Sequence, residues 1–97
     1  MDKAIFEFTV PMYGLPREIT AAREVQISLE DGAGMAGVIA AMREKLPELE
    51  GTVFRRGQDR LEENYKFNVN GRFYFAGEDF QLHPGDRIAL LVPVTGG

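Results

Sequence analysis

The chain has 97 residues, of which 44% are hydrophobic and 27% charged, a length and composition that suit one globular domain. Its net charge of −4 argues against a nucleic-acid-binding protein, and the absence of cysteine excludes disulfides, thiolate metal sites and cysteine nucleophiles. No apolar run approaches the roughly 18 residues of a membrane-spanning helix, and the N-terminus lacks a signal-peptide pattern, so we expect a cytoplasmic protein without a membrane partner.

Two segments near the N-terminus alternate apolar and polar residues with the period of a half-buried strand. Residues 4–10 read AIFEFTV, and residues 24–30 read EVQISLE. Prolines and a glycine interrupt the chain between them. We therefore expect a hairpin with a long connection over residues 11–23.

An amphipathic helix should follow, because apolar residues recur at the helical period. The stripe consists of Met35, Val38, Ile39, Met42, Leu46 and Leu49. Asp31 is a plausible start signal, and Pro47 disfavours the helical conformation at Leu46. We expect this helix to pack its stripe on the sheet and to end near Leu46.

The segment before the helix, residues 32–37, reads GAGMAG and matches the dinucleotide-binding pattern G-x-G-x-x-G. The strand ahead of it has a polar face, whereas the first strand of a dinucleotide-binding fold is buried on both faces. The remaining chain is also too short for that fold. We interpret the glycines as a turn that lets the helix approach the sheet.

Residues 50–64 mix arginines with acidic residues and show no clean periodicity. Such a mixture is typical of a solvated loop, with a short strand possible at residues 52–54. A loop that contacts a partner is the alternative interpretation.

The pair Asn70-Gly71 predicts a tight hairpin, because a type I′ turn needs positive φ at both central positions. The flanking segments, residues 65–70 and 72–75, are rich in β-forming residues. Residues 79–82 are expected to form a short turn of helix. The only histidine, His83, precedes a proline-glycine turn and is expected at the surface.

Residues 87–92 read RIALLV and predict the most buried strand, central in the sheet and parallel to the first strand. With a two-residue hairpin turn, strand parity places Phe73, Phe75 and Leu91 together on the open face as an apolar patch. A three-residue loop would instead bury both phenylalanines. Exposed apolar patches often mark partner sites, so these residues are the predicted partner interface.

The order of these elements predicts an α+β domain spanning residues 1–97. It should contain a mixed sheet of about five strands, one main helix on one face, and an extended Gly-Gly tail. No histidine pair is available for a metal, and the sequence lacks a P-loop or nucleophile elbow. The chain is therefore expected to bind no metal or cofactor and not to be an enzyme itself.

The last five residues are expected to form a flexible tail that projects from the final strand as an extended arm. They are Pro93, Val94, Thr95, Gly96 and Gly97. Proline ends the strand, the β-branched pair stiffens the arm, and glycines fit a channel too narrow for other residues. The α-carboxylate is a poor electrophile at neutral pH, so it needs activation, most simply as an acyl-adenylate. A partner enzyme would use ATP for that step.

Three sequence elements resemble the MoaD/ThiS family of small sulfur carriers, which have the ubiquitin-like β-grasp fold. They are V-N-G at residues 69–71, G-D at residues 85–86, and an apolar strand followed by PVTGG. The resemblance extends to the order of elements over the whole chain. It is strongest to MoaD, the small subunit of molybdopterin synthase, and next strongest to ThiS of thiamine synthesis.

The resemblance implies a mechanism in which a ubiquitin-activating-type adenylyltransferase adenylates the Gly97 carboxylate. A sulfur donor then converts it to a thiocarboxylate. The tail, residues 93–96, inserts into the large synthase subunit, which is MoaE-like, and Gly97 gives its sulfur to a pterin precursor.

Three alternatives remain open at the level of sequence. The chain could carry sulfur for another pathway, as ThiS does, or for a tungsten cofactor. It could be a protein modifier that forms isopeptide bonds through Gly97. It could also be an interaction module whose tail is inert.

Overall fold

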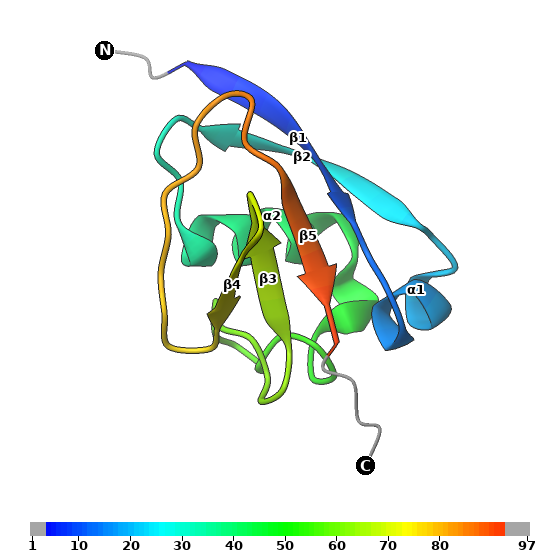
Figure 1. Ribbon diagram of the computed structural model, residues 1–97. Helices are drawn as coiled ribbons and strands as arrows, with labels where there is room; N and C mark the ends of the chain where they lie inside the picture. Colours follow the sequence, from blue (N-terminus) through cyan, green and yellow to red (C-terminus); the bar gives the residue numbers. More distant parts are fainter. Residues whose placement is uncertain (1–3, 93–97) are drawn as a thin grey trace.

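The computed structural model in Figure 1 describes residues 4–92. The elements are β1 (Ile5–Pro11), α1 (Leu15–Thr20), β2 (Glu24–Glu30), α2 (Met35–Lys45), the 3-10 helix η1 (Pro47–Leu49), β3 (Lys66–Val69), β4 (Arg72–Phe75) and β5 (Ile88–Leu91). Within these residues, no helix is both long and apolar enough to cross a membrane. Five strands and one main helix confirm the predicted fold class, α+β with the β-grasp arrangement.

The first hairpin pairs β1 with β2 in antiparallel register. Val10 lies opposite Val25 and Phe8 opposite Ile27, and all four side chains are buried. The predicted hairpin is therefore confirmed. The connection also holds the short helix α1, which the sequence analysis missed although Pro16 lies in its first turn, where proline favours helix initiation.

The second hairpin has the predicted two-residue turn. Val69 pairs with Arg72, and the turn residues Asn70 and Gly71 have φ values of 53° and 93°. Both values lie in the left-handed region that a type I′ turn requires. This register decides which side chains of β4 face the core.

β5 is the strand that joins the two halves of the fold. It pairs antiparallel with β3 along its whole length, and Leu90 forms a parallel bridge with Met12, the residue that follows β1. The predicted parallel direction relative to β1 is confirmed, but the predicted central position is not, because β5 is the end strand of its hydrogen-bonded sheet. The strands nevertheless form two hydrogen-bonded sheets, β1-β2 and β4-β3-β5, because β1 and β5 diverge beyond this bridge.

α2 packs its apolar stripe against one side of the strands (Figure 1). Five of the six predicted stripe residues are buried, and Leu46 is partly buried. The helix ends at Lys45, as predicted, but the proposed start signal at Asp31 is wrong. The N–H of Met35 is instead accepted by the carboxylate Oδ1 of Asp79, at 2.8 Å, a cap supplied from a distant loop.

The interpretation of residues 32–37 as a turn is supported by their geometry. Gly32 has a φ of 87°, in the left-handed region that favours glycine. A Cβ on Gly34 would lie 2.7 Å from Asp79 Oδ1 and 3.0 Å from the carbonyl oxygen of Phe80. The close approach that this glycine permits is thus to the loop that caps α2.

Two local predictions are wrong. Residues 52–54 form a turn with isolated bridges rather than a strand. Residues 79–82 are not helical, and Leu82 forms an antiparallel bridge with Ala33. In both segments the backbone path follows the burial of large side chains. The buried residues do not recur at a helical or strand period in the sequence. The buried side chains are Val53, Phe54, Phe80 and Leu82.

Residues 50–64 are also more ordered than a solvated loop. Leu61, Val53 and Phe54 are all fully buried. Arg43 of α2 donates to the carboxylate of Asp59 and to the carbonyl oxygen of Gln58. The loop is therefore fixed to the core by apolar anchors and to α2 by one guanidinium group.

A second polar network ties the hairpin to the start of β5. The Nδ2 of Asn70 donates to Asp86 Oδ1 at 3.0 Å, and the N–H of Arg87 donates to Asn70 Oδ1 at 2.9 Å. The backbone N–H of His83, followed by the side chain of Asn70, lowers the pKa of the Asp86 carboxyl from its ordinary value. Asp86 and Asn70 thus hold the predicted G-D element against the V-N-G turn.

Removing the cap of α2 should destabilise the fold. We expect Asp79→Ala to lower the free energy of unfolding by about 1 kcal/mol, because the N–H of Met35 loses its acceptor. Asp79→Asn should keep most of this stability, since its amide oxygen can still accept. Urea unfolding measures both, with the exposed neighbour Gln81→Ala as control. Equal stability of the alanine variant and the wild type would contradict this role.

The lowered pKa of Asp86 predicts a pH-dependent contribution to stability. The charged carboxylate is favoured in the folded state, so its contribution is present above the unfolded pKa and is lost as pH falls through the lowered folded pKa. The stability difference between wild type and Asp86→Asn should therefore shrink between pH 7 and about pH 2. Urea unfolding at both pH values tests this, and an unchanged difference would disprove it.

Candidate functional site

β5 leads directly to the predicted reactive tail. Its last residue is Leu91, and the following Val92 is half-buried against the core. The five predicted tail residues, Pro93, Val94, Thr95, Gly96 and Gly97, lie outside the described residues. Their roles therefore remain predictions, and the structure defines the base from which they start.

The loop between β1 and α1 contacts this base. Gly14 has a φ of 74°, and a Cβ there would lie 2.8 Å from Val92 Cγ2. Beside it, Tyr13 and Leu15 are exposed, and the Arg17 guanidinium lies 5.0 Å from the centre of the Tyr13 ring. The sequence analysis did not identify this cluster, although the adjacent Gly14 and Pro16 are a local signal for a tight turn into a helix.

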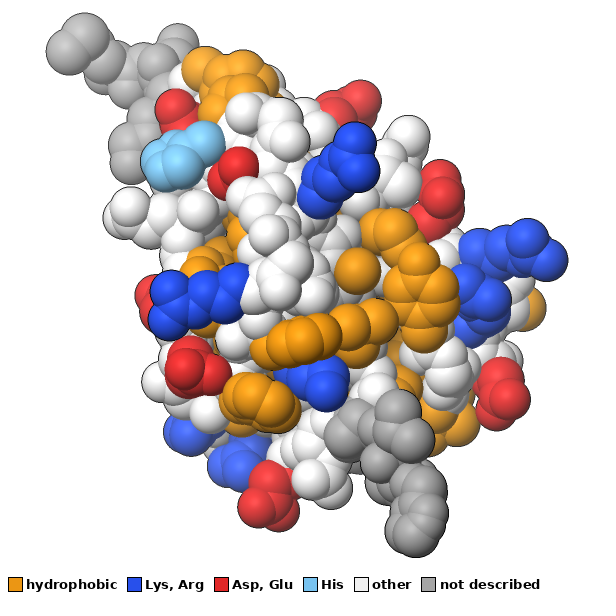
Figure 2. All heavy atoms as spheres, viewed as in Figure 1, with side chains coloured by type: hydrophobic (Ala, Val, Ile, Leu, Met, Phe, Trp, Pro, Cys, Tyr) orange, Lys and Arg blue, Asp and Glu red, His pale blue; other side chains and the backbone are white. Residues whose placement is uncertain are grey.

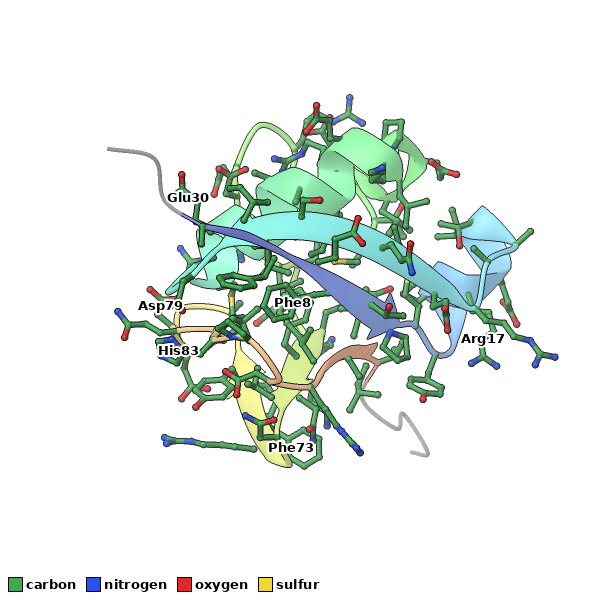
Figure 3. The ribbon with its side chains drawn as sticks, turned by 90° about the horizontal axis from the view of Figure 1, so that it is seen from above. Phe8, Arg17, Glu30, Phe73, Asp79 and His83 are labelled. Atoms are coloured by element: carbon green, nitrogen blue, oxygen red, sulfur yellow. The ribbon has the colours of Figure 1, made fainter. Side chains whose placement is uncertain are left out.

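The predicted apolar patch lies on the open face of the β4-β3-β5 sheet. Phe73 is 47% exposed and Phe75 is 48% exposed, while Leu91 is half-buried. Figure 3 shows Phe73 on the side of β4 that faces away from α2, whereas Phe8 points into the interior. The geometry predicted for the three residues is confirmed, and their role as a partner interface stays a prediction.

Lys66 is a member of this face that the sequence analysis missed. It lies directly opposite Phe75 on β4 and Leu91 on β5. Its ammonium nitrogen is 4.7 Å from the centre of the Phe73 ring and 5.6 Å from that of Phe75. The alternation of Lys66 with the buried Phe67 was the signal that places it here. We call Lys66, Phe73, Phe75 and Leu91 the open-face patch.

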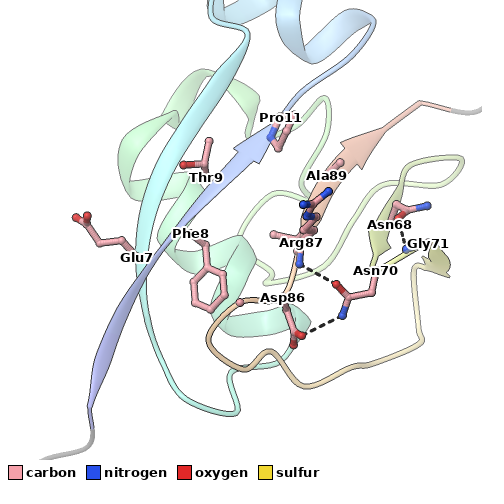
Figure 4. A pocket seen from close by; sticks show the side chains of 12 residues that line it. Glu7, Phe8, Thr9, Pro11, Asn68, Asn70, Gly71, Asp86, Arg87 and Ala89 are labelled. Carbon is pink, nitrogen blue, oxygen red and sulfur yellow. Dashed lines mark hydrogen bonds between the residues drawn. The ribbon is translucent and has the colours of Figure 1, made fainter.

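A groove of about 790 Å³ runs beside this patch, between the diverging strands β1 and β5 (Figure 4). Thr9 and Pro11 line it from β1, and Ala89 lines it from β5. Nowhere in residues 4–92 do three histidine, cysteine, aspartate or glutamate side chains cluster so that they could hold a metal ion. The groove shares Asn68 and Ala89 with the open face of the sheet.

His83 lies at the surface, as predicted. Its Nδ1 is 2.7 Å from Asp31 Oδ1, and both side chains are more than half exposed. Neither belongs to the open-face patch. The described residues thus place an exposed, largely apolar face next to the start of the tail.

Several solved structures from archaea share this fold. SAMP1 from Haloferax volcanii superposes with a TM-score of 0.77 at 25% identity, over 95% of this chain and 100% of that chain. Small archaeal modifier protein 1 from Methanosarcina acetivorans gives 0.70 at 22% identity, over 97% and 99%. A putative molybdopterin converting factor subunit 1 from Pyrococcus furiosus gives 0.66 at 23% identity, over 91% and 98%.

The sequence itself gives the family. Comparison with curated proteins finds no match. The model of the ThiS family, however, matches residues 10–97, which run from the end of β1 through the Gly-Gly terminus. Because the match extends over most of the sequence, the chain belongs to the ThiS family.

Proposed function

We propose that this protein is the sulfur-carrying small subunit of molybdopterin synthase. The observation that carries the proposal is the ending PVTGG, placed directly after the buried strand β5 in a ThiS-family domain. Five residues follow Val92, and an extended chain of that length spans at most about 17 Å. Such an arm can enter the active site of another protein while the folded domain docks outside.

The chemistry begins at the α-carboxylate of Gly97. An adenylyltransferase of the ubiquitin-activating type joins this carboxylate to the AMP moiety of ATP and releases pyrophosphate. Hydrosulfide from a sulfur donor then attacks the acyl carbon and displaces AMP, which leaves a thiocarboxylate. ATP therefore belongs to the activating partner, and this chain contributes the carboxylate and the surface by which the partner holds it.

The large, MoaE-like synthase subunit is the proposed second partner. Within that complex the thiocarboxylate gives up its sulfur to the pterin precursor, and water regenerates the Gly97 carboxylate. The open-face patch supports docking, because it is exposed and because Leu91 lies one residue before the base of the tail. A similar structure from P. furiosus carries the name of a putative molybdopterin converting factor subunit, which favours this pathway.

A protein modifier is the second candidate function. The names of two similar structures, which describe small archaeal modifier proteins, favour it. A modifier needs the same tail and the same adenylation, but its acyl group ends on a lysine amine of another protein. The two functions therefore share one fold and differ in the product that is formed.

The carrier function predicts a defined mass change. After incubation with the cognate adenylyltransferase, ATP and a sulfide source, the intact mass should rise by the exchange of one oxygen for sulfur, and fragmentation should place it at Gly97. One serine added after Gly97 should abolish the change, because the activated carboxylate is displaced from its position. Lys45→Ala, a substitution at an exposed residue of α2, is the control. If the wild-type mass does not change although the adenylyltransferase is shown to be active, the proposal is rejected.

The carrier and modifier functions predict different products. If the chain is a carrier, incubation of the thiocarboxylated chain with the large synthase subunit and pterin precursor should yield sulfur-containing product and the original carboxylate. Tryptic proteome digests from cells that express the chain should lack lysines that carry the remnant of residues 88–97, because Arg87 is the last tryptic cleavage site. Abundant remnants without sulfur transfer would assign the chain to the modifiers instead.

A further inference from the structure

Lys66 has no acidic partner in the part of the chain that the structure describes. Its side chain is half-buried, and its contacts there are with the rings of Phe73 and Phe75. The faces of aromatic rings attract a cation, but they accept no conventional hydrogen bonds from its three N–H donors. In the free protein, water must satisfy those donors.

The open-face strand positions of β3, β4 and β5 hold no acidic residue, although the chain as a whole carries a net charge of −4. At the end of β4, Glu78 Oε1 accepts from the backbone N–H of Phe75 at 2.8 Å. Register places on this face Lys66, Asn68, Phe73, Phe75, Ala89 and Leu91. Figure 2 shows hydrophobic and basic side chains gathered here, with acidic side chains toward the rim. The face is therefore apolar with a positive centre.

A protein that covers the two phenylalanine rings would also remove water from the Lys66 ammonium group. A charge that loses its water without gaining a partner is strongly disfavoured. The covering surface must therefore supply an acceptor, and a carboxylate satisfies both the hydrogen bonds and the charge. An apolar surface without an acid would be rejected for the same reason.

We propose that the open-face patch docks an apolar surface of the adenylyltransferase that has one carboxylate at its centre, aimed at Lys66. This inference rests on the proposed function and names the chemistry of its docking site. Lys66 pairs in register with Leu91, and Val92 follows at the base of the tail. The same partner thus binds the patch and receives the tail, so that docking of the patch positions the tail.

A second copy of this chain does not fit the same face. Two patches brought together would oppose two Lys66 ammonium groups, and the open-face strand positions of the described sheet offer no carboxylate to separate them. Like charges in such a contact repel. We therefore do not expect self-association through this face, and the test includes a measurement that would detect it.

The test compares binding with chemistry in one set of variants. Affinity for the adenylyltransferase is measured by calorimetry without ATP, and activation of Gly97 by ATP–pyrophosphate exchange. Lys66→Glu reverses the charge, Lys66→Gln removes it, and Lys66→Arg retains it. Lys45→Glu makes the same charge reversal at an exposed position at the end of α2 and is the matched control. Thermal unfolding establishes that each variant is folded.

The proposal expects Lys66→Glu to weaken binding at least about tenfold and Lys66→Gln by a smaller factor. Lys66→Arg should retain most of the affinity, and Lys45→Glu should stay within about twofold of the wild type. Raised salt should weaken the wild type more than Lys66→Gln. In the exchange assay, the substitutions should raise KM and leave kcat nearly unchanged, because the tail itself is intact.

Other outcomes would overturn the inference. Suppose that the wild type is activated, and that Lys66→Glu and Lys66→Gln bind the adenylyltransferase with wild-type affinity. The docking inference then fails, while the proposed function stands. If Lys66→Glu does not fold, normal binding by Lys66→Gln alone overturns it. Dimerisation that Phe73→Ser abolishes would assign the face to a second copy. Failure of wild-type activation, by contrast, rejects the proposed function itself.

Discussion

The alternation of inward and outward side chains along β3 and β5 is the constraint on which the rest of the structure depends. Phe67 and Val69 on β3, and Ile88 and Leu90 on β5, are buried beneath α2. With these positions committed to the core, every intervening residue must lie on the open face. The open face is thus fixed by the same alternation that forms the core. A shift of one residue in the strand register would exchange the side chains of the core and the open face.

Distant polar contacts then fix the parts that this alternation leaves undetermined. Asp79 caps α2 from a loop more than 40 residues away in sequence, and Arg43 holds the segment around Asp59 against the helix. Asn70 and Asp86 join the hairpin to the entry of β5. Each contact satisfies backbone or carboxylate groups that would otherwise be left without partners. Together they keep β5, and hence the base of the tail, at one place.

The proposed site has two parts. Its reactive atom is expected at the end of the chain, and the folded part is proposed to provide recognition. An apolar patch with a cation at its centre gives selectivity, because a partner must match both its shape and its charge. Gly14, packed against Val92, brings a second exposed cluster to the base of the tail. The fold therefore places two exposed clusters near Val92, the last described residue.

The sequence by itself determined the strands β1, β2, β3, β4 and β5, the stripe of α2, the Asn70-Gly71 turn and the exposed pair Phe73 and Phe75, because each depends on a local period or turn preference. It also gave the family, through the elements around β5 and the terminal glycines. Only the tertiary structure decided the burial of Val53 and Phe54 and the cap from Asp79. These features depend on contacts between residues far apart in the chain, and local sequence patterns carry no record of them.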